Sequence, residues 1–135
     1  MRVLILSASY GSGHAEAARS LAAAFAARGA EPAVVDHFRD LVHPGFASAS
    51  RALYYWLLRW APGVWALGYS LGDRLEPESP LALGMTRLGT TRLAHLLDTM
   101  RPDAVVTVHA TPAAAMATLV VSGRRVPPHT TAVTD

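Results

Sequence analysis

The sequence predicts an α/β fold, an open and mostly parallel sheet with helices packed on its faces. The chain opens on a continuous apolar run, VLIL at residues 3–6, which is typical of a strand buried on both faces of a parallel sheet. A glycine-rich turn, an alanine-rich helical stretch and a second short strand at residues 32–36 follow it. Strand, helix and strand patterns return at residues 104–108, 112–122 and 130–135, which continues the α/β alternation.

Residues 14–28 are predicted to form the first helix, because they are good helix formers and Leu21 and Phe25 recur on one face. Gly29 stands where a helix commonly ends in a left-handed residue. A right-handed crossover from the first strand to residues 32–36 makes these two strands parallel. The glycine-rich turn is therefore expected at the carboxyl edge of the sheet, where ligands enter open α/β folds.

Residues 81–100 are predicted to form one long amphipathic helix packed on the sheet. Leucine and methionine residues recur at helical spacing through this stretch, from Leu81 and Met85 to Met100. No repeat or low-complexity linker separates it from the strands that follow. Residues 1–135 are therefore expected to form a single domain, a size that can bury a core but is small for a complete two-substrate enzyme.

Residues 38–78 interrupt the alternation and are predicted to be an inserted helical region. This stretch holds all three tryptophans and all but one of the tyrosines, and two short helices are expected to meet at residues 61–63. Arg59 and the Pro62–Gly63 break argue against a membrane-spanning helix. Aromatic side chains edged by arginines are typical of the water–lipid interface, but packing on the domain's own core explains them equally well. The aromatic residues concerned are Tyr54, Tyr55, Trp56, Trp60 and Trp65.

The composition narrows the possible functions. All twelve basic residues are arginine, the net charge is only +2, and Arg124 and Arg125 are the only adjacent pair, so no nucleic-acid partner is expected. The absence of cysteine excludes disulfides and thiolate zinc sites and fits a cytoplasmic location. The apolar run at the N-terminus is too short for a secretory signal.

The turn SASYGSGHAE fits neither common nucleotide loop. Glu16 occupies the place of the third glycine in a dinucleotide fingerprint, and the phosphate-binding loop of nucleotide hydrolases needs a lysine that the chain lacks. Gly11 and Gly13 permit positive φ angles and close approach of a ligand to free N–H groups at the helix start, and Ser12 can cap the helix. His14, near the first helical position, is disfavoured as a cation by the helix dipole and is a candidate general base. The alternative is a structural histidine bonded to a loop carbonyl.

His109 ends a predicted strand at the same edge, where it is equally suited to contact a substrate or to play a structural role. Asp36 follows the second strand, but without the third glycine it is interpreted as a loop residue rather than a ribose ligand. Asp135 closes the last predicted strand in the same way. The other histidines show no metal-ligand spacing, so no metal site is expected.

Together these motifs resemble the monogalactosyldiacylglycerol synthase and processive diacylglycerol glucosyltransferase family, glycosyltransferases of the GT-B fold. The matching segments are VLILSASYGSGHAEAARSL, the aromatic stretch RALYYWLLRWAPGVWALGYSLGD, RPDAVVTVHATP and the closing TTAVTD, in the family's order. His14 matches the histidine of the family's Gly-x-Gly-His turn. His109 matches the histidine of its Thr-His-Pro turn, although Val108 and Ala110 flank it here.

The resemblance implies a GT-B enzyme of two Rossmann-like domains, of which this chain is the N-terminal, acceptor-binding one. The C-terminal domain, which holds most of the UDP-sugar donor, is absent, and no tightly bound cofactor is implied. His14 would act as the base in an inverting transfer of a hexose to diacylglycerol, with Gly11, Ser12, Gly13 and His109 around the substrates. The aromatic helices would dock on an anionic membrane, which implies a peripheral location on the inner face of the cell membrane.

Two other functions remain open at this point. One is a stand-alone Rossmann-like module that binds a membrane or a partner without catalysis. The other is half of a GT-B enzyme that acts on a soluble acceptor or as a sugar-nucleotide epimerase, which would keep His14 but would have no use for the aromatic helices.

Overall fold

The computed structural model describes residues 1–8, 12–73, 84 and 87–133, and within them it contains one four-stranded parallel sheet. The strands lie in the order β2-β1-β3-β4. Their bounds are β1 Arg2–Ser7, β2 Glu31–Asp36, β3 Ala104–Thr107 and β4 His129–Thr131. This confirms the predicted Rossmann-like α/β fold and each predicted strand within the described residues.

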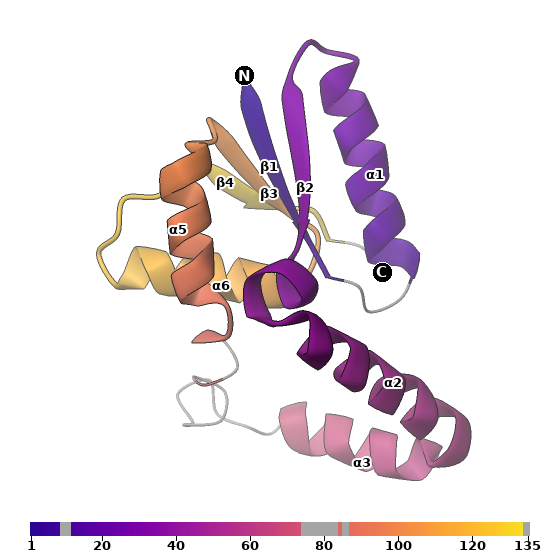
Figure 1. Cartoon of the computed structure of the whole chain (residues 1–135). Coiled ribbons are helices and arrows are strands. Elements are labelled where there is room, and N and C mark those ends of the chain that lie inside the picture. The colour runs from indigo at the N-terminus through magenta and orange to yellow at the C-terminus, as the bar shows by residue number, and fades with distance from the viewer. Residues whose placement is uncertain (9–11, 74–83, 85–86, 134–135) are drawn as a thin grey trace.

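Helices cover both faces of the sheet (Figure 1). Helix α1 (Ser12–Ala26) packs on one face, and α5 (Thr90–Met100) and α6 (Ala110–Val121) pack on the other. After α1 the chain turns at Gly29, which has a φ of 77°, a left-handed conformation that favours glycine, as predicted.

The alternation of side chains along β1 builds the two halves of the core. Val3 and Ile5 point toward α1 and pack with Ala18, whereas Leu4 and Leu6 point toward α5 and α6. All four of these β1 side chains are completely buried. A central strand with both faces covered therefore needs the unbroken apolar run seen in the sequence.

The parallel register brings the carboxyl ends of the strands to one edge. Ser7 at the end of β1 lies opposite Asp36 at the end of β2, and Thr107 of β3 lies opposite Thr131 of β4. The hydroxyl groups of Thr107 and Thr131 are hydrogen-bonded to each other at 2.8 Å. Residues that directly follow the strands are consequently gathered at this edge.

The prediction of one long helix over residues 81–100 is wrong. Leu88 and Gly89 form a turn, and α5 begins only at Thr90. Gly89 has a φ of 75°, which does not fit an α-helix, and this left-handed residue ends the regular spacing. Leu81 and Met85, which contributed to the prediction, lie outside the described residues.

The inserted region begins with a single wide helical turn, η1 (His37–Val42), and continues through α2 (Pro44–Trp60) and α3 (Pro62–Asp73). The predicted break falls at Ala61, between the two helices. Both helices lie beyond the carboxyl edge of the sheet, below it in Figure 1. Within the described part of the chain, no helix has the length and apolar character needed to cross a membrane.

Candidate active site at the carboxyl edge of the sheet

His14 is the third residue of α1, because the helix begins at Ser12 rather than after it. The predicted cap at Ser12 is therefore misplaced by at least one residue, and its side chain lies outside what is described, as does Gly11. Gly13 is helical and does not use a positive φ, but the space around its Cα is open to a ligand. The Ser7 hydroxyl donates a hydrogen bond to the His14 carbonyl at 3.3 Å, which ties the start of α1 to the end of β1.

His109 has a structural role, since it caps a helix, and its ring also faces His14, while contact with a substrate stays a prediction. Its Nδ1 accepts a hydrogen bond from the Thr111 backbone N–H at 3.1 Å, as the N-cap of α6. An Nδ1 that accepts carries no proton, so the neutral ring has its proton on Nε2. Burial lowers the pKa of His109, and positive charge on His14 or His37 lowers it further. The ring is therefore held neutral.

The rings of His14 and His109 lie edge to face, with centroids 4.8 Å apart and planes at 81°. Both rings line a cavity of about 320 Å³ at the carboxyl edge of the sheet. The rest of its wall is largely apolar and consists of Val108, Ala110, Thr131, Ala132 and Val133. A neutral imidazole in such a cavity can take a proton from a hydroxyl group that enters with an apolar body.

Sequence reasoning missed a third histidine at this edge, His37. It is completely buried, its Nε2 donates a hydrogen bond to the Leu88 carbonyl at 2.9 Å, and burial lowers its pKa. Its Nδ1 has no hydrogen-bond partner among the described residues. The signal that could have found it is its position directly after β2, since the strand ends in a parallel sheet lie together.

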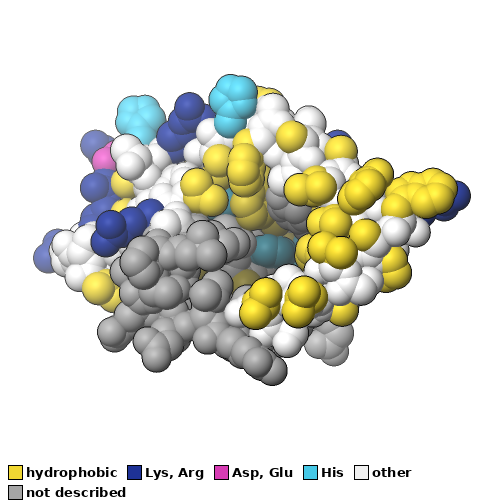
Figure 2. All heavy atoms as spheres, turned by 90° about the horizontal axis from the view of Figure 1, so that it is seen from below, with side chains coloured by type: hydrophobic (Ala, Val, Ile, Leu, Met, Phe, Trp, Pro, Cys, Tyr) yellow, Lys and Arg dark blue, Asp and Glu magenta, His cyan; other side chains and the backbone are white. Residues whose placement is uncertain are grey.

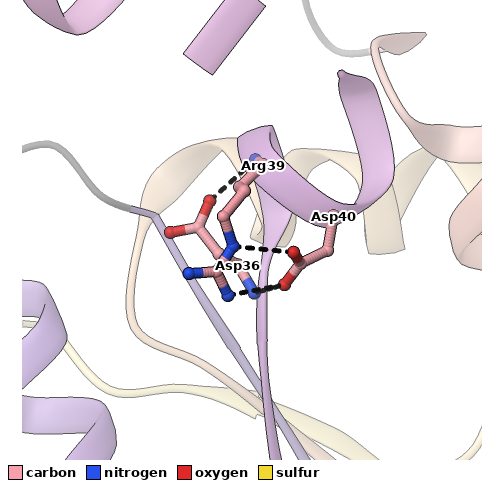
Figure 3. Close-up of polar contacts among 3 residues, drawn as sticks. All are labelled: Asp36, Arg39 and Asp40. Atoms are coloured by element: carbon pink, nitrogen blue, oxygen red, sulfur yellow. Dashed lines mark hydrogen bonds and ion pairs between the residues drawn. The ribbon is translucent and has the colours of Figure 1, made fainter. Parts of the chain in front are cut away.

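Asp36 is the last residue of β2 rather than the predicted loop residue, and its side chain has a structural role. One carboxylate oxygen accepts a hydrogen bond from the Arg39 backbone N–H at 2.9 Å and caps η1 (Figure 3). The Asp40 carboxylate in turn accepts from the Asp36 backbone N–H at 2.9 Å and from the Arg39 guanidinium at 2.8 Å, and this guanidinium lowers the pKa of Asp40. Asp36 is therefore committed to holding the start of the inserted region.

The aromatic residues of the inserted region divide into two groups. Tyr54 of α2 and Trp65 of α3 pack edge to face, with centroids 5.0 Å apart, and join the two helices. Tyr55, Trp56 and Trp60 are 52%, 55% and 68% exposed. None of the 17 described residues of α2 is buried, so these aromatic side chains do not pack on the domain's own core.

Seen from the carboxyl edge of the sheet, apolar side chains gather over α2 and α3 (Figure 2). Leu53, Val64 and Leu67 are exposed alongside the aromatic residues. The Arg59 guanidinium lies 5.4 Å from the centroid of the Trp60 ring. An apolar helical surface of this size, with arginine beside tryptophan, is typical of an interaction surface.

The described residues contain no group of three or more histidine, aspartate or glutamate side chains placed to hold a metal ion. Asp135, considered as a further residue of this edge, lies outside the described residues. The site therefore consists of His14, His37 and His109, the cavity beside two of them, and the exposed helices below.

Comparison with known proteins gives two similarities and one negative result. Residues 14–135 match the family described as monogalactosyldiacylglycerol (MGDG) synthase. The chain is 30% identical over 105 residues to the processive diacylglycerol beta-glucosyltransferase of Bacillus cytotoxicus, an alignment that covers 78% of this chain and 27% of that protein. No solved structure shows significant similarity to the chain.

Proposed function

The chain belongs to the monogalactosyldiacylglycerol synthase family, and we propose that it forms the acceptor-binding, N-terminal part of a glycolipid glycosyltransferase. The reaction proposed is transfer of a hexose from a UDP-sugar to diacylglycerol with inversion. The alignment with the Bacillus cytotoxicus glucosyltransferase spans about a quarter of that protein, and we propose that the donor site lies outside the aligned part.

The observation that carries this proposal is the histidine pair. His14 and His109 follow the ends of different strands, and their ring centroids lie 4.8 Å apart. Both rings line one largely apolar cavity. An acceptor with a single hydroxyl on an apolar glycerolipid body matches such a wall better than a polar, fully soluble one does.

In the proposed reaction His14 acts as the general base. The acceptor oxygen attacks the anomeric carbon of the sugar, His14 takes the hydroxyl proton, and the carbon–oxygen bond to the diphosphate breaks with its electron pair leaving on UDP. Attack from the side opposite the leaving group inverts the anomeric centre. The positive end of the helix dipole at the start of α1, beside Gly13, favours the approach of a negatively charged diphosphate.

The proposed acceptor is delivered from an anionic membrane, which α2 and α3 contact from the cytoplasmic side. Three exposed aromatic side chains, Tyr55, Trp56 and Trp60, would enter the headgroup region, with Arg51 and Arg59 beside lipid phosphates. Both helices lie at the carboxyl end of the sheet, and the cavity residues Val108 and Ala132 directly follow β3 and β4 at that end. A lipid hydroxyl would therefore approach His14 from the end of the sheet that is proposed to contact the bilayer.

An assay of lipid products tests the proposed function. The 135-residue chain and the product of its reading frame continued beyond residue 135 are each incubated with UDP-glucose or UDP-galactose and diacylglycerol vesicles. We expect glycolipid from the longer protein only, because the donor site is proposed to lie outside this chain.

Other outcomes would decide against this function. Sugar transfer by the 135-residue chain alone would refute the proposed division between acceptor and donor parts. A reading frame that ends at residue 135, with vesicle binding and no transfer, would favour a stand-alone binding module. Transfer to a soluble acceptor in preference to diacylglycerol would contradict the proposal that a membrane delivers the acceptor.

A further inference from the structure

Phe38 lies between the inserted helices and the histidine pair. We propose that it is a positioning residue through which the seating of α2 sets the orientation and environment of the His109 ring. This inference rests on the proposed function for its meaning, since it concerns control of the same site, but the contacts that support it do not depend on that function.

The Phe38 ring contacts both parts. Its centroid lies 6.3 Å from that of His109, with the planes at 82°, and 6.1 Å from that of Phe46 in α2, with the planes at 27°. Phe38 is only 8% exposed, whereas Phe46 is 43% exposed on the inserted helix. The series Phe46, Phe38, His109 and His14 is therefore a continuous path of ring contacts from α2 to the proposed base.

The backbone beside Phe38 is held from two sides. The preceding residue, His37, is buried, and its Nε2 donates a hydrogen bond to the Leu88 carbonyl. This bond joins the start of the inserted region to the turn before α5. A Cβ on Gly89 would lie 3.2 Å from the His37 ring, so glycine at this position makes the close approach possible. Asp36 caps the same turn. Because the start of η1 is anchored in this way, α2 can act on His109 through the Phe38 ring rather than by moving the whole turn.

Close packing around Phe38 couples the position of the Phe46 ring to that of the His109 ring. Phe38 is buried, whereas Phe46 is partly exposed and His109 lines the cavity, so a displacement of Phe46 that moves the Phe38 ring also changes the edge that this ring presents to His109. His109 is additionally held at Nδ1 by the Thr111 N–H, which restricts its ring to small rotations. When α2 shifts on binding a membrane, the His109 ring should therefore change its orientation. Through the edge-to-face contact, the His14 ring should change as well.

The His109 ring also supplies a direct readout. Burial is the main cause of its lowered pKa, His14 and His37 lower it further, and Asp36 acts in the opposite direction. Phe38 is one of the side chains that cover this ring. Removing the phenyl group should admit water to His109 and raise its pKa toward the ordinary value of 6.5.

Nuclear magnetic resonance titration of the histidine rings in the 135-residue chain tests the proposal. Phe38→Leu and Phe38→Ala should raise the pKa of His109 and shift the ring signals of both His109 and His14. Phe25→Leu is the matched control, since Phe25 is a partly buried phenyl near the end of α1 remote from His14, and it should change neither ring. Should Phe38→Ala not fold, Phe38→Leu decides. An unchanged His109 titration in a folded Phe38 variant would overturn the proposal.

A second measurement separates this inference from the proposed function. Bicelles of phosphatidylcholine and phosphatidylglycerol, added to the unchanged chain, should shift the His109 ring signals, and Phe38→Leu should reduce that shift. Binding that leaves His109 unchanged would overturn the link to α2. Absence of binding would contradict the membrane part of the proposed function, and the titration above would still decide whether Phe38 positions His109.

Discussion

The imidazole rings of His14 and His109 lie edge to face, with centroids 4.8 Å apart, although one residue opens the first helix and the other caps the helix after β3. His109 has one ring nitrogen committed to the Thr111 N–H, and its pKa is lowered by burial and by charge on His14. The half-buried, helix-capping ring of His109 is therefore favoured in its neutral form beside His14.

Replacing the proposed base should remove most of the activity. In a protein that includes the proposed donor part and transfers sugar, His14→Ala is expected to lower turnover by ~10² or more and to leave donor affinity nearly unchanged, because proton removal from the acceptor is lost. Steady-state kinetics with a fixed UDP-sugar give both quantities. His95→Ala, an exposed histidine on α5, is the control and should retain full activity. An unchanged turnover for His14→Ala would exclude His14 from the mechanism.

The two roles of His109 can be separated by substitution. His109→Asn keeps an N-cap acceptor for α6 but removes the imidazole, so it should fold stably and lose about tenfold in turnover. His109→Ala also loses the cap and should unfold about 1 kcal/mol more easily in urea than His109→Asn.

The same pair of changes at His43 provides the comparison, because its Nδ1 caps α2 by accepting from the Gly45 N–H. His43→Ala and His43→Asn should differ in stability by a similar amount. Neither should reduce turnover tenfold. Equal stability of the two His109 variants would contradict the capping role.

The free energy of unfolding should fall when the pH is lowered below about 6.5. His37 and His109 have lowered pKa values in the folded chain, whereas the unfolded chain takes up protons near the ordinary value of 6.5. The unfolded state therefore binds more protons as the pH falls from 6.5 to the folded pKa values, and each histidine costs up to about 1.4 kcal/mol per pH unit in that interval.

Urea unfolding at a series of pH values between 7.5 and 5 measures this slope. The His109→Asn variant should show a shallower slope, because one of the two groups is missing. A stability that does not change over this interval would mean that both rings titrate normally in the folded chain.

Alanine at Gly89 should cost more stability than alanine at Gly123. Both glycines have left-handed φ angles, 75° and 79°, so either substitution carries a backbone cost of about 1 kcal/mol. At Gly89 the new Cβ would also lie 3.2 Å from His37 and 3.3 Å from Leu41, while at Gly123 it meets nothing within 4 Å. The free energy of unfolding, measured in urea, should therefore fall more for the Gly89 variant. Equal losses would mean that the His37 ring moves aside at no cost in free energy.

The exposed tryptophans of α2 should contribute to vesicle binding and not to folding. Trp56→Ser with Trp60→Ser is expected to weaken co-sedimentation with anionic vesicles severalfold, because both rings are more than half exposed. The melting temperature should stay within a few degrees of the original. Val121→Ser, an 87% exposed apolar side chain on α6, is the control and should bind vesicles normally. If the tryptophan variant co-sedimented with vesicles as well as the unchanged chain does, Trp56 and Trp60 would not contribute to membrane binding.

The local elements were predictable because each depends on neighbours in sequence. The run at residues 3–6 has no polar side chain to expose, so only a strand covered on both faces suits it. Pro62 and Gly63 break the aromatic stretch for reasons of backbone geometry alone. The prediction over residues 81–100 failed because periodic leucines record which face is apolar and not whether a glycine between them is helical.

His37 escaped prediction for a related reason. Its role depends on a hydrogen bond to Leu88, 51 positions away, and on a glycine that allows the ring to approach. Neither the His37–Phe38 dipeptide nor the turn at Leu88 carries a local signature of that contact. Phe38 likewise acquires its importance from Phe46 and His109, which the spacing of residues does not connect.

The sequence by itself determined the strands, the crossover that makes β1 and β2 parallel, the break between the aromatic helices and the placing of His14 at a helix start. These follow from side-chain period, backbone preferences and chain connectivity, which act over a few residues. The pattern of residues placed His14 and His109 at one edge of the sheet, but the contact of their rings, the presence of His37 beside them and the link through Phe38 to α2 come from the folded structure. The physical reason is that strand register and helix packing are settled by long-range burial, which alone brings separate strand ends within contact distance.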